Sequence, residues 1–181
     1  MYKLVRSFLF LFPTESIHYF SMNLLRFACK IGFIKKIISN SFSFNNVSLQ
    51  KKLLGLTFKN PVGLGAGFDK NALYLNELET LGFGFVEIGT VTPLPQNGNE
   101  KPRLFRLPKD QALINRMGFN NDGVEVVAQR LSDWKLRTEN SKLIVGGNIG
   151  KNKITPNENA WKDYEICFSG LFDCVDYFVV N

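Results

Sequence analysis

Residues 60–70 read Asn-Pro-Val-Gly-Leu-Gly-Ala-Gly-Phe-Asp-Lys, a short apolar run that stops in a polar, glycine-rich tip. The same change from apolar to polar residues occurs at 87–93, 147–153 and 178–181. Apolar runs of this length between helical patterns indicate buried parallel strands, and such folds build their active sites just past the carboxyl ends of the strands. We therefore expect the chemistry of this chain at these four tips.

From residue 61 onward, strand patterns alternate with helical patterns. The expected strands span 62–66, 85–89, 143–147 and 177–181, and the expected helices span 71–81, 121–131 and 157–172. This alternation, without a long antiparallel stretch, predicts an α/β fold with a parallel sheet. The connection over 90–120 is longer than an ordinary loop, and loops of that length are usually functional.

Residues 1–38 carry apolar side chains at helical spacing and predict two amphipathic helices divided at Pro13. The apolar run 8–12 is far shorter than the roughly 20 residues of a membrane span. A basic fringe is typical of helices that lie on a membrane surface or a partner. The alternative is a helical hairpin packed on its own domain. Residues 39–60 read as a linker with a small hairpin around Gly55.

The net charge of +6 is unevenly distributed. Residues 1–40 hold six cationic side chains against one acidic one, so the remaining 141 residues are nearly neutral. A nucleic-acid surface needs a basic stripe with exposed stacking groups across a folded face, and the main body shows no such stripe. The sequence therefore predicts no nucleic-acid partner.

The three cysteines, Cys29, Cys167 and Cys174, form no CxxC pair, and an odd number argues against a disulfide framework. We expect Cys167 and Cys174 to be small buried apolar residues. The single histidine, His18, has no partner for a zinc site, so no metal is expected.

Gly63, Gly65 and Gly67 suggest a dinucleotide fingerprint, but the Rossmann pattern needs its third glycine where Phe68 stands. The glycines would still let the backbone lie against a flat ligand, to which Lys70 brings a cation. The alternative is a tight strand-to-helix turn with a solvated lysine.

Asparagine recurs at separate tips, as Asn115, Asn148 and Asn181. Each amide offers donors and an acceptor, which suits a planar heterocycle rich in amide groups. Asn120 and Asn121 directly precede an expected helix, so we interpret both as helix caps.

The chain resembles the quinone-linked, membrane-associated class (class 2) of dihydroorotate dehydrogenase, through residues 60–70, 82–93, 102–107, 114–121 and 148–153. The resemblance implies an FMN-containing (β/α)8 TIM barrel that oxidises (S)-dihydroorotate to orotate in de novo pyrimidine (UMP) biosynthesis. It implies that residues 1–38 form a quinone tunnel on the membrane surface. The location would be the cytoplasmic face of a bacterial cell membrane, or the inner mitochondrial membrane in a eukaryote.

The resemblance also implies site residues. The positions that match flavin contacts are Ala66, Gly67, Phe68, Asp69, Lys70, Thr90, Asn148 and Asn181. The positions that match orotate contacts are Lys70, Asn115, Arg116, Met117, Gly118, Phe119 and Asn181. The positions that match the quinone tunnel are His18 and Arg106.

One departure from the family pattern is large. A barrel of this type needs about 250 residues, so residues 61–181 are expected to form about its first half. The serine that serves as catalytic base in this class is expected beyond Asn181, and no catalytic residue is expected within the chain. Two alternatives stay open: an inactive fragment or membrane-binding module, and a soluble NAD- or fumarate-linked relative, which lacks the basic helical extension.

Overall fold

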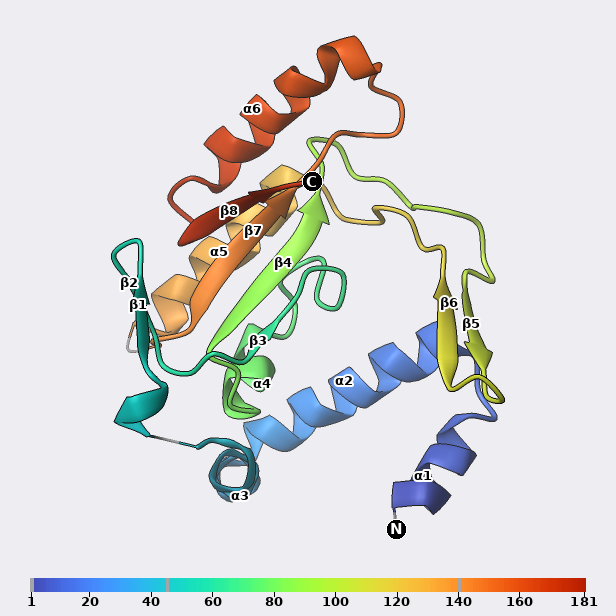
Figure 1. Ribbon diagram of the computed structural model, residues 1–181, viewed down its shortest axis with the longest axis vertical. Helices are drawn as coiled ribbons and strands as arrows, with labels where there is room; N and C mark the ends of the chain where they lie inside the picture. Colours follow the sequence, from blue (N-terminus) through green and yellow to red (C-terminus); the bar gives the residue numbers. More distant parts are fainter. Residues whose placement is uncertain (1, 45, 140) are drawn as a thin grey trace.

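The computed structural model describes residues 2–44, 46–139 and 141–181 and centres on a four-stranded parallel sheet (Figure 1). Its strands, in spatial order, are β3 (Gly63–Leu64), β4 (Phe85–Val91), β7 (Ile144–Ile149) and β8 (Tyr177–Val180). All neighbouring pairs are parallel. The expected α/β class is confirmed, and each expected strand lies within a few residues of an observed one.

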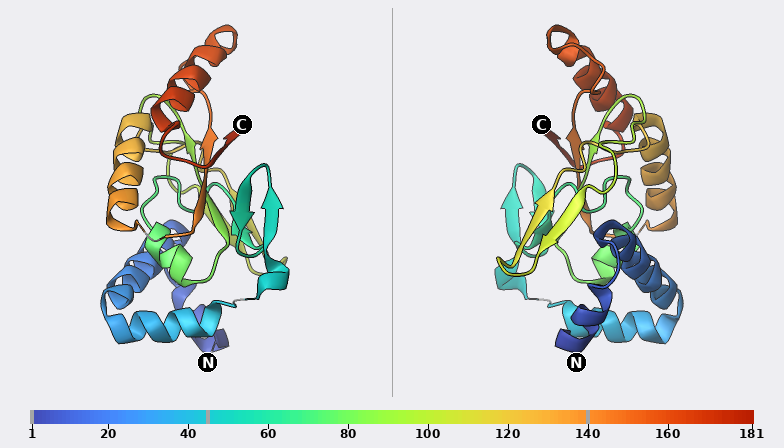
Figure 2. Two further views of the ribbon diagram at one scale, coloured as in Figure 1. Left: turned by 90° about the vertical axis from the view of Figure 1, so that its left-hand side faces the viewer. Right: turned by 90° about the vertical axis from the view of Figure 1, so that its right-hand side faces the viewer.

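Three helices pack on one face of this sheet, as the two views of Figure 2 show. They are α4 (Leu75–Thr80), α5 (Val124–Arg137) and α6 (Ala160–Leu171), the last preceded by the short 3-10 turn η2 (Asn157–Asn159). The most deeply buried side chains of the core come from these helices and the two central strands: Leu78, Val86, Ile88, Val91, Val127, Leu131, Val145, Ile149, Cys167 and Leu171. Each large apolar side chain buried in this way stabilises the fold by roughly 1.5–3 kcal/mol.

The cysteines form no disulfide. Cys167 and Cys174 are buried, as expected, although Cys174 lies just past the end of α6 rather than within it. Burial raises the pKa of the Cys167 thiol to about 12, so this thiol stays protonated and serves as a small apolar group.

The register of the sheet brings the strand ends to one edge. Val91 of β4 pairs with Ile149 of β7, and Ile149 pairs with Val180 of β8. Because these three strands end at the same level, Thr90, Asn148 and Asn181 lie at neighbouring positions.

Helix α4 begins at Leu75, four residues later than the sequence pattern indicates. The buried carboxylate of Asp69 accepts hydrogen bonds from the backbone N–H groups of Leu73 (2.8 Å) and Tyr74 (2.7 Å). Ala72 has φ of 54°, a left-handed conformation that cannot continue a helix. The side chain of Asp69 therefore shapes the turn after β3.

Helix α5 begins at Val124 rather than at residue 121, after Gly123 with φ of 86°. The interpretation of Asn121 as a helix cap is wrong. Its Oδ1 accepts hydrogen bonds from Gly123 N (2.9 Å) and Thr92 N (3.2 Å), so this amide joins the long connection to the end of β4.

The amino-terminal region contains three helices rather than two: α1 (Tyr2–Leu9), α2 (Thr14–Lys30) and α3 (Gly32–Phe42). The break at Pro13 is confirmed. The second break, at Ile31, was not expected, and extended backbone there (φ −90°, ψ 106°) turns the chain between α2 and α3. Helix α2 joins the core through Met22. Among the described residues, no helix is both long and apolar enough to cross a membrane.

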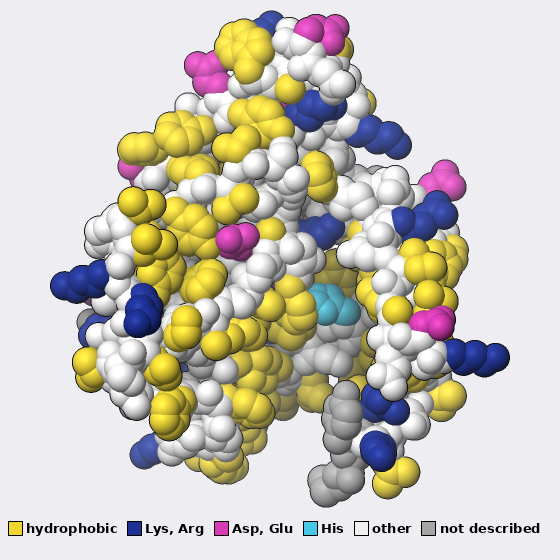
Figure 3. All heavy atoms as spheres, viewed as in Figure 1, with side chains coloured by type: hydrophobic (Ala, Val, Ile, Leu, Met, Phe, Trp, Pro, Cys, Tyr) yellow, Lys and Arg dark blue, Asp and Glu magenta, His cyan; other side chains and the backbone are white. Residues whose placement is uncertain are grey.

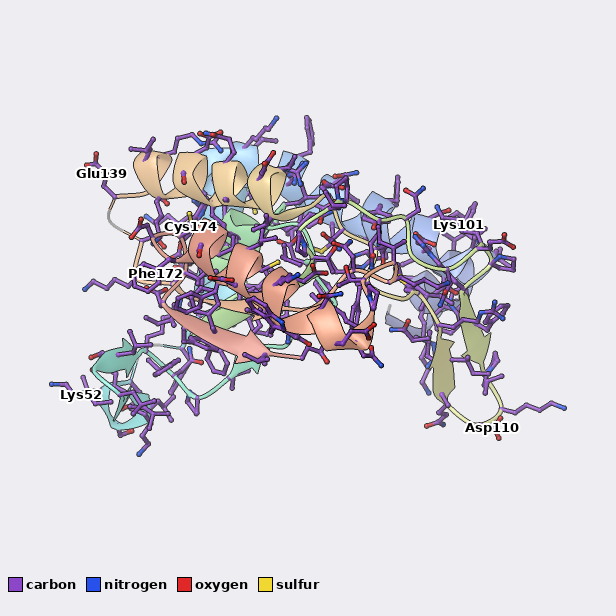
Figure 4. The ribbon with its side chains drawn as sticks, turned by 90° about the horizontal axis from the view of Figure 1, so that it is seen from above. Lys52, Lys101, Asp110, Glu139, Phe172 and Cys174 are labelled. Carbon is purple, nitrogen blue, oxygen red and sulfur yellow. The ribbon has the colours of Figure 1, made fainter. Side chains whose placement is uncertain are left out.

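Two small hairpins project from the side opposite α5, and Lys52 and Asp110 mark them in Figure 4. The first, β1 (Lys51–Leu53) with β2 (Leu56–Phe58), follows the 3-10 turn η1 (Val47–Leu49) and confirms the hairpin expected around Gly55. The second, β5 (Leu104–Leu107) with β6 (Ala112–Asn115), lies inside the connection expected to be a loop. That connection is therefore partly regular structure.

Candidate functional site

Three polar side chains meet at the carboxyl ends of β4, β7 and β8. Thr90 Oγ1 donates a hydrogen bond to Asn148 Oδ1 (2.6 Å). Asn181 Nδ2 donates to Thr90 Oγ1 (2.9 Å) and to Asn148 Oδ1 (3.3 Å). We call these residues the strand-end triad. No described residue accepts a hydrogen bond from Asn148 Nδ2, so the triad keeps a free amide donor for a ligand.

The loop after β3 lies beside this triad because Gly67 N donates to Gly89 O of β4 (2.9 Å). Gly65 and Gly67 are exposed, and a methyl group added at either would meet no atom within 4 Å. Gly67 also has φ of 100°, a conformation that favours glycine. The loop therefore offers open backbone against which a flat ligand could lie.

Lys70, at the end of the same loop, reaches across to the long connection. Its Nζ donates to Gly118 O (2.8 Å) and to Asn120 Oδ1 (2.7 Å). The interpretation of Asn120 as a helix cap is therefore wrong, because its side chain holds the lysine. Burial, with a smaller contribution from Arg103, lowers the pKa of Lys70.

A cavity of about 240 Å³ lies between α2, the loop after β3 and the β5–β6 hairpin. We call it the His18 cavity, because the His18 ring forms part of its wall and meets the Phe68 ring edge-on at 4.7 Å between centroids. Figure 3 shows the single histidine inside the hollow between the main body and the hairpin. Burial lowers the pKa of His18, against the opposing effect of Asp69.

The run from Asn115 to Phe119 is divided between two places. Asn115 and Met117 line the His18 cavity, and Asn115 Oδ1 accepts from Met117 N (3.0 Å). The Phe119 ring lies close to Gly150, beyond the end of β7. Arg116 is exposed and does not line the cavity. Gly118 contributes its carbonyl to Lys70.

Arg106 does not share the His18 cavity. Its Nη1 donates to the carbonyls of Phe10 (3.2 Å) and Phe12 (2.8 Å), and its guanidinium lies 4.5 Å from the Phe10 ring centroid. The structure thus places the two expected quinone-tunnel residues on different cavities, with Arg106 at the junction of α1 and α2.

Sequence reasoning missed two contacts that organise this region. Glu15 and Arg103 form a nearly buried ion pair between α2 and the segment before β5. Tyr164 Oη donates to Asn181 O (2.5 Å), which fixes the residue that completes the triad. The signal for Glu15 was present, since it is the only acidic residue among the first 40.

Four parallel strands with helices on one face, and with glycines and amides at the carboxyl ends, match half of the eight-stranded TIM barrel class. Residues 48–181 match the family model described as dihydroorotate dehydrogenase, and the chain belongs to that family.

Curated relatives that match the chain carry the name dihydroorotate dehydrogenase (quinone). The protein from Christiangramia forsetii is 56% identical over 182 residues, covering all of this chain and 52% of the relative. The protein from Xanthomonas campestris pv. campestris is 48% identical over 181 residues, covering 49% of the relative. The chain therefore spans about half the length of the curated relatives it matches.

Solved structures give the same fold. The dihydroorotate dehydrogenase of Eimeria tenella in complex with ferulenol superposes with a TM-score of 0.67 at 43% identity, over 82% of this chain and 42% of that one. The ligand-free form of the Eimeria enzyme gives 0.67 at 42% identity.

Proposed function

We propose that the protein oxidises dihydroorotate to orotate with bound FMN and passes the electrons to a membrane quinone. Family membership and the names of the relatives support this function. The structural observation that carries it lies at one edge of the sheet. There the strand-end triad meets Lys70 and the loop of residues 65–70 after β3, which we call the glycine loop. This edge combines a flat, open backbone surface with amide groups and one cation.

The residues at this edge fit FMN. The isoalloxazine ring is flat and carries several carbonyl and nitrogen acceptors, which match the free amide donor of Asn148 and the open backbone of residues 66–70. FMN, when bound, would accept the electrons that dihydroorotate loses. Thr90 and Asn181 would hold the Asn148 amide in one orientation, because both bond to it.

The substrate would lie between the glycine loop and residues 115–119. The Lys70 ammonium would bind the carboxylate of dihydroorotate, and its place near Gly118 is fixed by the two acceptors that it already has. The free amide donor of Asn115 would pair with a ring carbonyl group, and Asn181 Oδ1, whose amide nitrogen already bonds to Thr90 and Asn148, would accept from a ring N–H group. These contacts would hold the dihydroorotate ring in one orientation for the transfer of its electrons to FMN. The serine base implied by the resemblance remains a prediction for sequence after Asn181.

The His18 cavity is the proposed route for quinone. Its lining combines aromatic and aliphatic side chains with the charged groups of Glu15, Asp69 and Lys70, and it runs from α2 to Phe68 in the loop after β3. Because burial lowers its pKa, His18 is neutral at pH 7 and suits an uncharged quinone. Arg106 lies on the neighbouring cavity beside α1, which shares Glu15 and Leu104 with the His18 cavity, and would act before quinone enters the His18 cavity.

Helices α1 to α3 would rest on the membrane surface. They expose large apolar side chains next to basic ones, which is the pattern of helices bound at a lipid interface. The exposed apolar residues of this surface are Leu4, Phe8, Leu11, Phe20, Leu24, Phe27, Phe33 and Ile37. With bacterial relatives, the cytoplasmic face of the cell membrane is the proposed location.

The proposal is tested by purifying the protein, recording its flavin absorbance, and measuring reduction of a short-chain quinone that depends on dihydroorotate. Retained flavin and quinone turnover are expected from the full-length protein. Turnover with NAD or fumarate but not quinone would favour a soluble-type relative. Vesicle binding without flavin or turnover would favour a membrane-binding module.

A further inference from the structure

A groove of about 580 Å³ lies between the α2–α3 hairpin and helices α4 and α5. The left view of Figure 2 shows α4 between α5 above and the α2–α3 hairpin below. The groove shares no lining residue with the strand-end triad, and its proposed role is independent of FMN and dihydroorotate. We call it the basic groove because five of its lining side chains are cationic: Arg26, Lys30, Lys35, Arg130 and Arg137.

Two of these cations are engaged by the protein. The Arg26 guanidinium donates to Leu73 O and lies 4.5 Å from the Tyr74 ring centroid. Arg130 Nη1 donates to Asp122 Oδ2 (2.6 Å) and Asn71 O (3.3 Å). These contacts fix the inner wall of the groove.

The other three cations keep free donors. Within the described residues, no acceptor is bonded to the ammonium groups of Lys30 and Lys35. Among the described residues, Arg137 bonds only through Nε, to Asp133 O (3.0 Å), and no described acceptor bonds its terminal nitrogens. The three side chains come from α2, α3 and α5, so separate elements direct cations to one groove.

The lining contains a single carboxylate, Glu77, which is buried on α4. Burial raises the pKa of Glu77 against the opposing effects of Arg26 and Lys35, so one partly desolvated carboxylate faces five cations. The carboxylate of Asp122 forms its ion pair with Arg130 and not with the other cations of the groove. Cations that outnumber the carboxylates beside them repel one another, and an anion with several acceptor oxygens relieves that repulsion.

We propose that the basic groove binds a phosphate group, carried by a phospholipid headgroup or free in solution. A phosphate can accept hydrogen bonds from several cations at once, whereas a carboxylate has only two oxygens. The exposed Asn76 amide also lines the groove: its Oδ1 accepts from Trp134 Nε1 (3.0 Å), and no described residue accepts from its Nδ2.

The test compares wild type with a groove variant, Lys35→Gln with Arg137→Gln, and a control variant, Lys51→Gln with Lys52→Gln. Both variants lose two positive charges from exposed side chains, and the control residues lie on β1, outside the groove. The first probe is inorganic phosphate, measured by calorimetry. The second is cosedimentation with phosphatidylglycerol vesicles, against phosphatidylcholine vesicles.

We expect the groove variant to bind at least about tenfold more weakly, since each hydrogen bond between charged groups is worth enough for such a change. The control should stay within about twofold of wild type. Loss of phosphate binding identifies a free phosphate ligand, and loss of phosphatidylglycerol binding alone identifies a headgroup. The single variant Lys35→Gln should show a smaller loss in the same direction and replaces the double variant if that one does not fold. Equal losses in groove and control variants, unchanged binding in the groove variant, or no binding of either probe would overturn the proposal.

Discussion

The guanidinium of Arg103 holds the carboxylate of Glu15, which lies 88 residues earlier in the chain, through two hydrogen bonds. Nε lies 3.0 Å from Oε2 and Nη2 lies 2.6 Å from Oε1. The remaining nitrogen, Nη1, donates to Asn97 O (2.6 Å) and Asn99 O (3.1 Å). One buried side chain therefore joins α2 to the long connection, and its partner Glu15 lines the His18 cavity.

Replacing Arg103 with leucine should lower the free energy of unfolding by about 3–5 kcal/mol, because the change leaves a nearly buried carboxylate without its partner. The side chains of Arg103 and Glu15 are 7% and 13% exposed. Lys101 provides the control, since it lies 3.5 Å from the same carboxylate but is 69% exposed. Lys101→Leu should cost under about 1 kcal/mol. Urea denaturation measures both, and equal losses would contradict a special role for Arg103.

The same pair predicts a pH dependence of stability. The hydrogen bonds from Arg103 lower the pKa of Glu15 below its ordinary 4.5. A carboxyl whose pKa is lowered by folding stabilises the protein above its unfolded pKa, and that stability is lost as the pH falls through the folded pKa. Glu15→Gln should therefore reduce the loss of stability below about pH 4.5, as measured by urea denaturation at several pH values. An unchanged pH profile would show that the pair does not contribute.

His18 can be titrated directly because it is the only histidine in the chain. Burial lowers its pKa, so the midpoint in a proton NMR titration should lie below 6.5. Folding disfavours the charged ring, so unfolding binds a proton between the folded pKa and 6.5, and stability should fall as the pH drops through that window. A midpoint at or above 6.5 would contradict the burial of the ring against Phe68.

The strand-end triad depends on the hydroxyl of Thr90. Thr90→Val should lower the free energy of unfolding by about 1–3 kcal/mol, because Asn148 and Asn181 each lose a partner at a buried position. FMN affinity, measured by quenching of flavin fluorescence, should fall as well. Thr90→Ser keeps the hydroxyl and should restore FMN affinity close to wild type. Normal FMN affinity in Thr90→Val would show that the strand-end triad does not contribute to flavin binding.

A substitution at Gly65 should distinguish an effect on ligand binding from an effect on folding. It has an ordinary backbone conformation, and an added methyl group would meet open space. Gly65→Ala should therefore leave the free energy of unfolding nearly unchanged while weakening FMN, because the methyl group would occupy space proposed for the ring. In contrast, an added Cβ at Gly89 would lie 2.3 Å from Asn148 O, so Gly89→Ala should disrupt the sheet. Normal FMN binding by Gly65→Ala would remove the glycine loop from the site.

The strands of the parallel sheet were predictable because each is a buried apolar run with an abrupt polar end. The recurrence of asparagine at those ends correctly predicted that Asn148 lies near Asn181. The β5–β6 hairpin was not predictable, since its turn, over residues 108–111, lacks the glycine that marks the β1–β2 hairpin at Gly55. The roles of Asn120 and Asn121 depend on Lys70 and Thr92, which lie far away in sequence. No local pattern reveals such partners, and the same holds for Glu15 and Arg103.

The most direct test of the proposed site is the rate at which dihydroorotate reduces the bound flavin, followed anaerobically by the loss of flavin absorbance. Lys70→Ala in the full-length protein should slow this step by about 10²–10³-fold, because it removes the cation proposed to hold the substrate carboxylate. Lys52→Ala, on the exposed β1–β2 hairpin, should leave the rate unchanged. Equal rates in wild type and Lys70→Ala would contradict the assignment of this edge of the sheet to dihydroorotate oxidation.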